Sequence, residues 1–180
     1  MLLPLLSIFL VLVDSYKILV VNPKLGYSHM NFMGKIADTL ADAGHDVVSL
    51  ESNYYSILDD DELLEHLKAE KFDVGITELF DFTGIAVYEA IGLKNMIGTH
   101  ASNSLAESTA YAIGAPVTPS FMPASQGITG DSTSFSTRAV NLLFTLLSWY
   151  FQKSAASAAE SVMMKKLGKT ATPIWVNNTN

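Results

Sequence analysis

The strongest constraint on the fold is an alternation of short apolar runs with longer segments of helical spacing. Runs rich in β-branched and other apolar residues predict strands at 17–22, 46–50, 72–77 and 93–99. Apolar residues recur three or four positions apart in the intervening segments 29–43, 56–70 and 85–91. This alternation is typical of an α/β fold, a Rossmann-like parallel sheet with helices on both faces.

Local signals refine these boundaries. Ser28 is a candidate cap for the first helix, because a serine oxygen can accept a backbone N–H of the first turn. Gly44, Gly92 and Gly168 are expected helix stops, since glycine tolerates a left-handed conformation. Three later helices are predicted, at 102–113, 138–152 and 154–167, with an irregular segment rich in proline and glycine after the first of them.

Composition limits the functional classes. The chain has 180 residues, 49% of them hydrophobic, and a net charge of −7, which together favour one folded domain and argue against a nucleic-acid binder. It contains no cysteine, so it has no disulfide framework and no thiolate metal site. Bases outnumber acids beyond Arg138, which is explained either by a solvated helix face or by contact with an acidic partner or membrane surface.

The amino terminus has the pattern of a targeting segment. Residues 2–13 are apolar or small and carry no charge, but they are too few for a membrane-spanning helix. They match the apolar core of a secretory signal peptide, so we expect residues 1–15 to be removed. A buried amino-terminal helix or strand is the alternative.

Chemistry is expected at the carboxyl ends of the strands, where ligands of parallel α/β sheets bind. His29 lies at the start of the first predicted helix and can act as a general base near neutral pH. Glu78 follows the third strand and would fix the imidazole tautomer if that strand lies beside the first. A purely structural hydrogen bond between the two is the competing interpretation. His100 ends the fourth strand and could line the same pocket.

Other site signatures are absent from the sequence. The first turn has one glycine, too few for a dinucleotide fingerprint, and there is no phosphate-binding loop or GxSxG elbow. The four histidines lack metal-ligand spacing, and we expect structural roles for His45 and His66. The apolar segment 141–151 is too short to span a bilayer. It fits a core-facing helix, an interfacial membrane contact or one wall of a lipophilic site.

Two long segments carry a family resemblance. The segments YKILVVNPKLGYSHMNFMGKIADTLADAGHDVVSL and FDVGITELFDFTGIAVYEAIGLKNMIGT resemble the amino-terminal half of UDP-glucuronosyltransferases. The resemblance covers about residues 16–168, and it implies the amino-terminal domain of a two-domain, GT-B glycosyltransferase. It is most specific at SHMNFM, AGHDV and FDVGITE.

The resemblance implies an activity and its residues. A histidine at the position of His29 removes the hydroxyl proton of a lipophilic acceptor, whose oxygen attacks the anomeric carbon of UDP-glucuronate with inversion. The family usually pairs this histidine with an aspartate, where this chain has Glu78. Because glutamate is one methylene longer than aspartate, its backbone must lie at a different distance from His29 if the carboxylate is to make the same contact. Acceptor contacts are expected from Tyr27, Phe32 and His100.

The resemblance also implies limits. The family holds its UDP-sugar mainly in the carboxyl-terminal domain, and residues 169–180 resemble no part of it. We therefore expect a domain at 16–168 with a short tail, truncated before the donor site, in the endoplasmic reticulum lumen. Its activity would depend on a donor half from a longer form or a full-length partner, with no tightly bound cofactor and no metal. A non-catalytic module that binds small molecules or pairs with transferases is the alternative.

Overall fold

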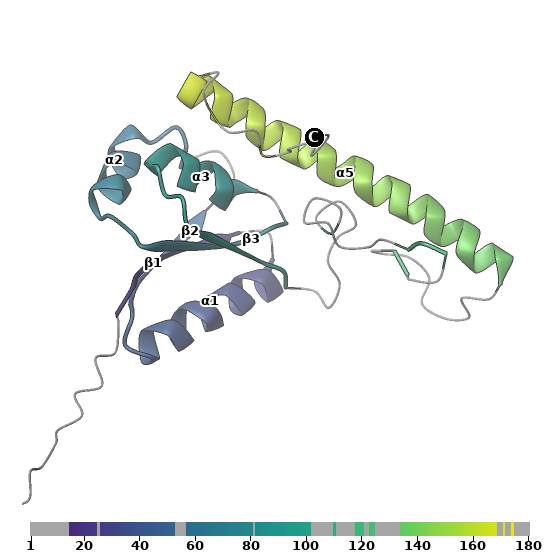
Figure 1. The fold of residues 1–180 in the computed structure, drawn as a ribbon, viewed down its shortest axis with the longest axis horizontal. Helices are drawn as coiled ribbons and strands as arrows, with labels where there is room; N and C mark the ends of the chain where they lie inside the picture. The colour runs from purple at the N-terminus through teal and green to yellow at the C-terminus, as the bar shows by residue number, and fades with distance from the viewer. Residues whose placement is uncertain are drawn as a thin grey trace, which may run out of the picture.

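The predicted alternation of strands and helices is confirmed. A computed structural model of the chain describes residues 15–24, 26–52, 57–80, 82–101, 110, 118–120, 123–124, 134–168, 171 and 174. In chain order, its elements are β1 (Lys17–Pro23), α1 (Tyr27–Asp42), β2 (Asp46–Ser52), α2 (Asp61–Ala69), β3 (Val74–Glu78), α3 (Thr83–Ile91), β4 (Met96–Thr99) and α5 (Phe135–Leu167) (Figure 1).

The strands form a four-stranded parallel sheet in the order β2-β1-β3-β4. The central strand β1 pairs with β2 and β3, which places Val21 opposite both Leu50 and Thr77. At the outer edge, Glu78 of β3 lies opposite Thr99 of β4. The chain therefore has the Rossmann-like α/β arrangement expected from its sequence, consistent with a GT-B amino-terminal domain.

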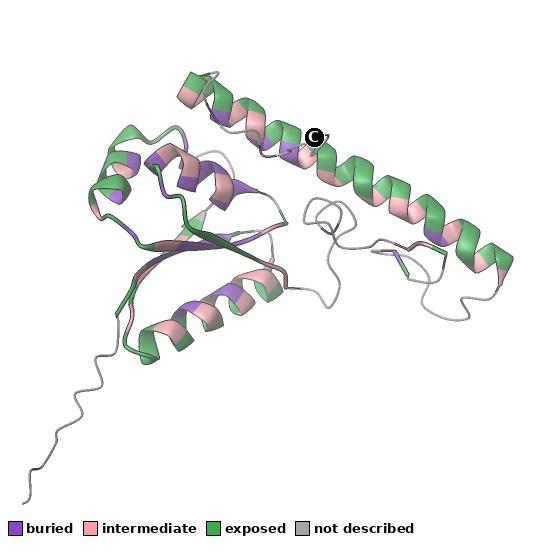
Figure 2. Ribbon diagram, in the orientation of Figure 1, coloured by how far each residue is buried: buried purple, intermediate pink, exposed green. Residues whose placement is uncertain are grey.

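Helices cover both faces of the sheet, which explains why residues 18–21 of β1 are all apolar (Figures 1 and 2). On one face, Ile18 and Val20 pack with Met33 and Ala37 of α1. On the other face, the buried cluster joins β1 to α2, α3 and the carboxyl-terminal part of α5. The buried residues of that cluster from the three helices are Leu64, Leu67, Ala86, Val87, Tyr88, Ile91 and Met163.

Most predicted helix ends agree with the structure. Gly44 and Gly92 have φ angles of 94° and 76°, the left-handed conformation that ends α1 and α3. Helix α2 begins after Asp60, whose side chain accepts the Leu63 N–H at 2.9 Å. The prediction for Ser28 was wrong. Helix α1 starts at Tyr27 and has no side-chain cap, so this serine lies inside the first turn and cannot occupy the capping position.

The prediction of two helices between 138 and 167 was also wrong. Residues Phe135–Leu167 form one helix of 33 residues, because this range contains neither glycine nor proline to interrupt it. It ends at Gly168, as expected. Among the described residues, no helix is long and apolar enough to cross a membrane. The predicted signal segment at 2–13 and most of the predicted helix at 102–113 lie outside the described residues.

Candidate active site

Three polar side chains meet at the carboxyl edge of the sheet. His29 lies in the first turn of α1, immediately after β1, and Glu78 is the last residue of β3. His100 follows β4 directly. Because β3 lies between β1 and β4 and all three strands are parallel, their ends reach the same edge.

The structure brings His29 and Glu78 into direct contact. The distance between His29 Nδ1 and Glu78 Oε1 is 2.7 Å, within hydrogen-bond range. The glutamate side chain is fully buried, whereas the imidazole is 25% exposed. A carboxylate can only accept hydrogen bonds, so this geometry assigns the imidazole proton to Nδ1 and leaves the Nε2 lone pair available. The site therefore has the arrangement of an oriented general base.

Glu78 is held from a second side as well. The backbone N–H of Ala101, just beyond β4, donates to the same Oε1 atom at 3.1 Å. The other carboxylate oxygen, Oε2, is buried and has no hydrogen-bond partner among the described residues. The His29 contact and the Ala101 bond together hold the carboxylate in place.

Two residues that sequence reasoning missed help to shape the site. Asn22, buried at the end of β1, donates from Nδ2 to the carbonyl oxygen of Met30 at 3.1 Å. This bond ties the strand end to the first turn of α1, which carries His29. The ring of Phe80 lies 5.2 Å from the His29 ring at an interplanar angle of 58°, and Phe80 is 41% exposed. The sequence signal that could have indicated Phe80 is its position two residues after Glu78.

The three predicted acceptor contacts occupy different environments. His100 is partly buried near both members of the pair. Burial lowers the pKa of His100, the charge of Glu78 opposes this shift, and His29 adds to it. Tyr27 is 84% exposed at the start of α1. Phe32 is partly buried and packs against the apolar cluster between α1 and the sheet.

The remaining histidines lie elsewhere. His45 Nδ1 accepts the backbone N–H of Tyr16 at 3.3 Å, and His66 lies 3.6 Å from Glu70 on the exposed side of α2. Both arrangements agree with the structural roles expected for them. Within the described part of the chain, no three histidine or acidic side chains gather closely enough to hold a metal ion.

An open cleft of about 720 Å³ lies at the opposite, amino-terminal edge of the sheet. Its lining includes Tyr16, Lys68, Lys71, Phe72 and Asn95. Among the described residues that line this cleft there is no histidine, and so no histidine–acid pair like the one at the carboxyl edge. The chemistry therefore favours the carboxyl edge as the candidate active site.

Comparison with known proteins points in the same direction. Three Caenorhabditis elegans proteins match, each named "Putative UDP-glucuronosyltransferase", with the designations ugt-48, ugt-46 and ugt-47. The match to ugt-48 is 24% identical over 195 residues and covers 73% of this chain. The chain is UDP-glucuronosyltransferase-like in sequence. No protein-family model and no solved structure matches it.

The extent of these matches is limited. The chain spans 37% of the length of ugt-48. The matches to ugt-46 and ugt-47 are 47% identical over 53 residues and 49% identical over 45 residues, which is 29% and 25% of this chain. They cover 10% and 8% of those two proteins. The relationship therefore concerns a part of each relative.

Proposed function

We propose that this chain is the acceptor-binding part of a UDP-glucuronosyltransferase-like glycosyltransferase. The observation that carries the proposal is the 2.7 Å contact between His29 Nδ1 and the buried Glu78 carboxylate. A histidine oriented by a buried acid is an arrangement suited to general-base catalysis. The sequence similarity to ugt-48 supports the same reaction class.

In the proposed reaction, His29 Nε2 takes the proton of an acceptor hydroxyl. The acceptor oxygen forms a bond to the anomeric carbon of UDP-glucuronate while the bond from that carbon to UDP breaks. UDP leaves with the bonding electrons, and the configuration at the carbon inverts. Glu78 holds the imidazole in the required tautomer and stabilises the imidazolium that forms.

The surroundings of His29 fit a lipophilic acceptor. Phe80 is an exposed aromatic side chain beside the base, and Tyr27 is an exposed one at the start of the same helix; we propose both as acceptor contacts. His100 would add a hydrogen-bonding group to the same edge. Phe32 stays in the proposal with an indirect role, since it lies on the same helix as His29 and packs against the cluster between that helix and the sheet. A luminal location follows only from the predicted signal segment and is part of the proposal.

The donor side of the reaction requires a further part. We propose that residues 16–168 form the acceptor domain and that the UDP-sugar is held mainly by a second half, from a longer form or a partner transferase. This agrees with a chain that spans 37% of ugt-48. Turnover would then depend on both parts together.

The experiment measures UDP release from UDP-glucuronate with a phenolic acceptor. The full chain is assayed alone and together with the carboxyl-terminal half of ugt-48. We expect turnover only in the mixture, and we expect His29→Ala to lower it by about 10²–10⁴-fold. His66→Ala, which changes an exposed histidine on α2, is the matched control and should retain full activity.

Two results would contradict parts of this proposal. Equal turnover by His29→Ala and wild type would exclude His29 as the base. Turnover by the chain alone would show that the second half is not required. Saturable binding of the phenol without turnover in either setting would instead support the non-catalytic binding module.

A further inference from the structure

The amino-terminal part of α5 has its polarity reversed relative to an ordinary surface helix. Four polar residues at spacings of four, three and four face inward or lie partly buried: Asn141, Thr145, Ser148 and Gln152. Asn141 is only 4% exposed. Residues that recur with this spacing share one side of a helix. The covered side therefore carries these four polar side chains together with Phe144, which is also partly buried.

The opposite side is apolar and open to solvent. Its exposed members are Phe135, Leu142, Leu143, Leu146, Leu147, Trp149, Tyr150 and Phe151, and we call them the outer apolar surface. Leu146 and Tyr150 are 59% and 72% exposed. The interpretation of 141–151 as a core-facing helix was therefore wrong for these side chains. A contiguous apolar surface of this kind marks an interaction site.

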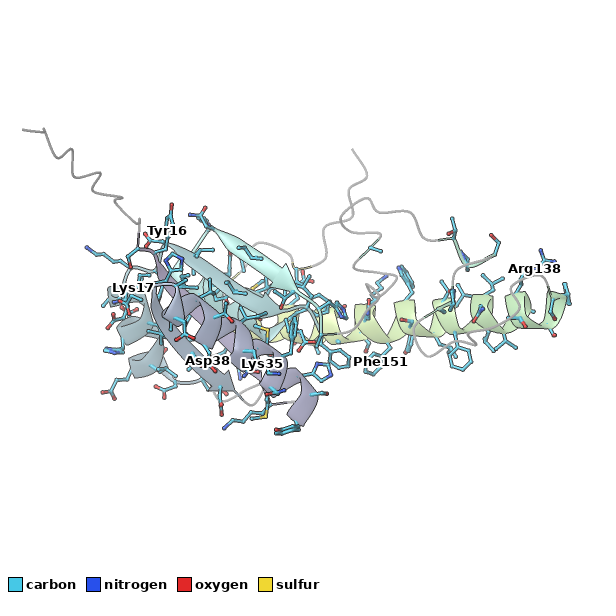
Figure 3. The ribbon with its side chains drawn as sticks, turned by 90° about the horizontal axis from the view of Figure 1, so that it is seen from below. Tyr16, Lys17, Lys35, Asp38, Arg138 and Phe151 are labelled. Carbon is cyan, nitrogen blue, oxygen red and sulfur yellow. The ribbon has the colours of Figure 1, made fainter. Side chains whose placement is uncertain are left out.

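The two parts of α5 differ in their environment (Figures 2 and 3). The carboxyl-terminal part buries Ala156, Ala159 and Met163 in the clusters that join it to α3. The amino-terminal part extends past the sheet, with Arg138 near its outer end and Phe151 closer to the body of the protein. The outer apolar surface is thus carried by a continuous helix whose carboxyl-terminal part is packed on the protein.

Charge on α5 points to the chemistry of the partner. The exposed Arg138 and Lys153 flank the apolar stretch, and no acidic residue occurs in α5 before Glu160. This contrasts with a chain whose net charge is −7. The Lys153 ammonium lies 5.1 Å above the Trp149 ring. Tryptophan, tyrosine and basic side chains next to leucines are the residues enriched where protein meets the headgroups of a bilayer.

We propose that the outer apolar surface binds an anionic lipid bilayer, with α5 lying in the plane of the interface. The leucines and aromatic rings would enter the boundary of the acyl chains, while Arg138 and Lys153 contact lipid phosphates. The buried polar side of the helix remains packed on the protein. This inference does not depend on the catalytic proposal, because none of its residues belongs to the site at the carboxyl edge.

The test uses Trp149 as a local probe in the full chain. Trp175→Phe leaves Trp149 as the single tryptophan, since the chain has two. Its emission is recorded with phosphatidylcholine vesicles that contain phosphatidylserine, and with the same vesicles carrying brominated acyl chains. We expect a shift to shorter wavelength and quenching by the brominated lipid, both weakened by added salt.

Two double variants test which residues contact the bilayer. Leu143→Gln combined with Leu147→Gln should weaken vesicle binding at least about tenfold, because two half-exposed apolar side chains are lost from the contact. The matched control combines Met96→Gln with Ile97→Gln, which changes two comparably exposed apolar residues on β4. This control should bind as the wild type does.

Three outcomes would overturn the proposal. Trp149 emission that stays unchanged at saturating lipid would show that α5 does not contact the bilayer. Vesicle binding without quenching of Trp149 would assign membrane contact to another part of the chain, such as residues 2–13. A doubled mass in light scattering, with a Trp149 shift that requires no lipid, would assign the surface to a second copy of the chain.

Discussion

Replacing Gly84 by alanine tests how closely helix α3 must approach strand β3. An alanine Cβ at this position would lie 2.1 Å from Thr77 Oγ1 and 2.4 Å from Thr77 Cβ. Ordinary contacts between carbon atoms are about 3.5–4.0 Å. The Thr77 hydroxyl could rotate away, but its Cβ is fixed to the strand, so α3 would have to move outward by about 1 Å.

The expected loss in the free energy of unfolding follows from the residues that α3 packs against. Ala86, Val87 and Tyr88 are fully buried in the cluster that α3 forms with the sheet, α2 and α5, and an outward shift loosens all three. Overpacking of this kind costs about 1–3 kcal/mol, and weakening a buried hydrogen bond adds about 1 kcal/mol. Alanine recovers at most about 1 kcal/mol of helix propensity. We expect the free energy of unfolding to fall by about 2–3 kcal/mol and Tm by about 5–10 °C.

The assay is urea and thermal unfolding of the full chain followed by far-ultraviolet circular dichroism. Gly34→Ala is the matched control, because Gly34 also lies in a helix but no atom would contact its added Cβ within 4 Å. That change should raise the free energy of unfolding by about 0.5–1 kcal/mol. If Gly84→Ala were as stable as Gly34→Ala, the argument from close packing would be refuted.

Two further predictions concern buried groups. The Tyr88 hydroxyl lies 2.7 Å from the Ile76 carbonyl oxygen and 3.1 Å from the Leu19 carbonyl oxygen. Tyr88→Phe should therefore lower the free energy of unfolding, measured by urea titration, by about 1–2 kcal/mol. An unchanged urea midpoint would contradict this. Burial lowers the pKa of His100, so between that pKa and about 6.5 the unfolded chain binds more protons than the folded one. Stability should therefore fall as pH drops from 7 toward 5, and His100→Asn should make that fall shallower; an identical slope in both proteins would refute the assignment.

Local signals explain why much of the fold could be predicted. Helix stops at Gly44 and Gly92 follow from a backbone conformation that glycine adopts at little cost. Serine is a weaker signal, because it occurs inside helices as well as at their caps. Ser28 lies within α1, and Ser154 lies within the uninterrupted α5. Without a glycine or proline, tertiary packing decides where such helices begin and whether they continue.

The candidate site depends on the order of the strands in the sheet. His29 and Glu78 can meet only because β3 pairs with β1, and the order of strands along the chain does not determine that neighbour. The added methylene of glutamate does not prevent the contact, since the distance is 2.7 Å. The Ala101 N–H bond and the Phe80 ring contact depend on loop conformations that have no periodic signal.

Helix α5 shows that a clear periodic pattern of polar residues can still predict the wrong side of a helix as the buried one. The stripe of Asn141, Thr145, Ser148 and Gln152 is present in the sequence, and a polar stripe on a helix normally faces water. On that rule, the leucines between these residues would pack inward. The burial of Asn141 and the exposure of Leu146 show the opposite orientation. Apolar side chains that face outward on an anchored helix carry a free-energy cost in water, and that cost is removed when an apolar partner covers them.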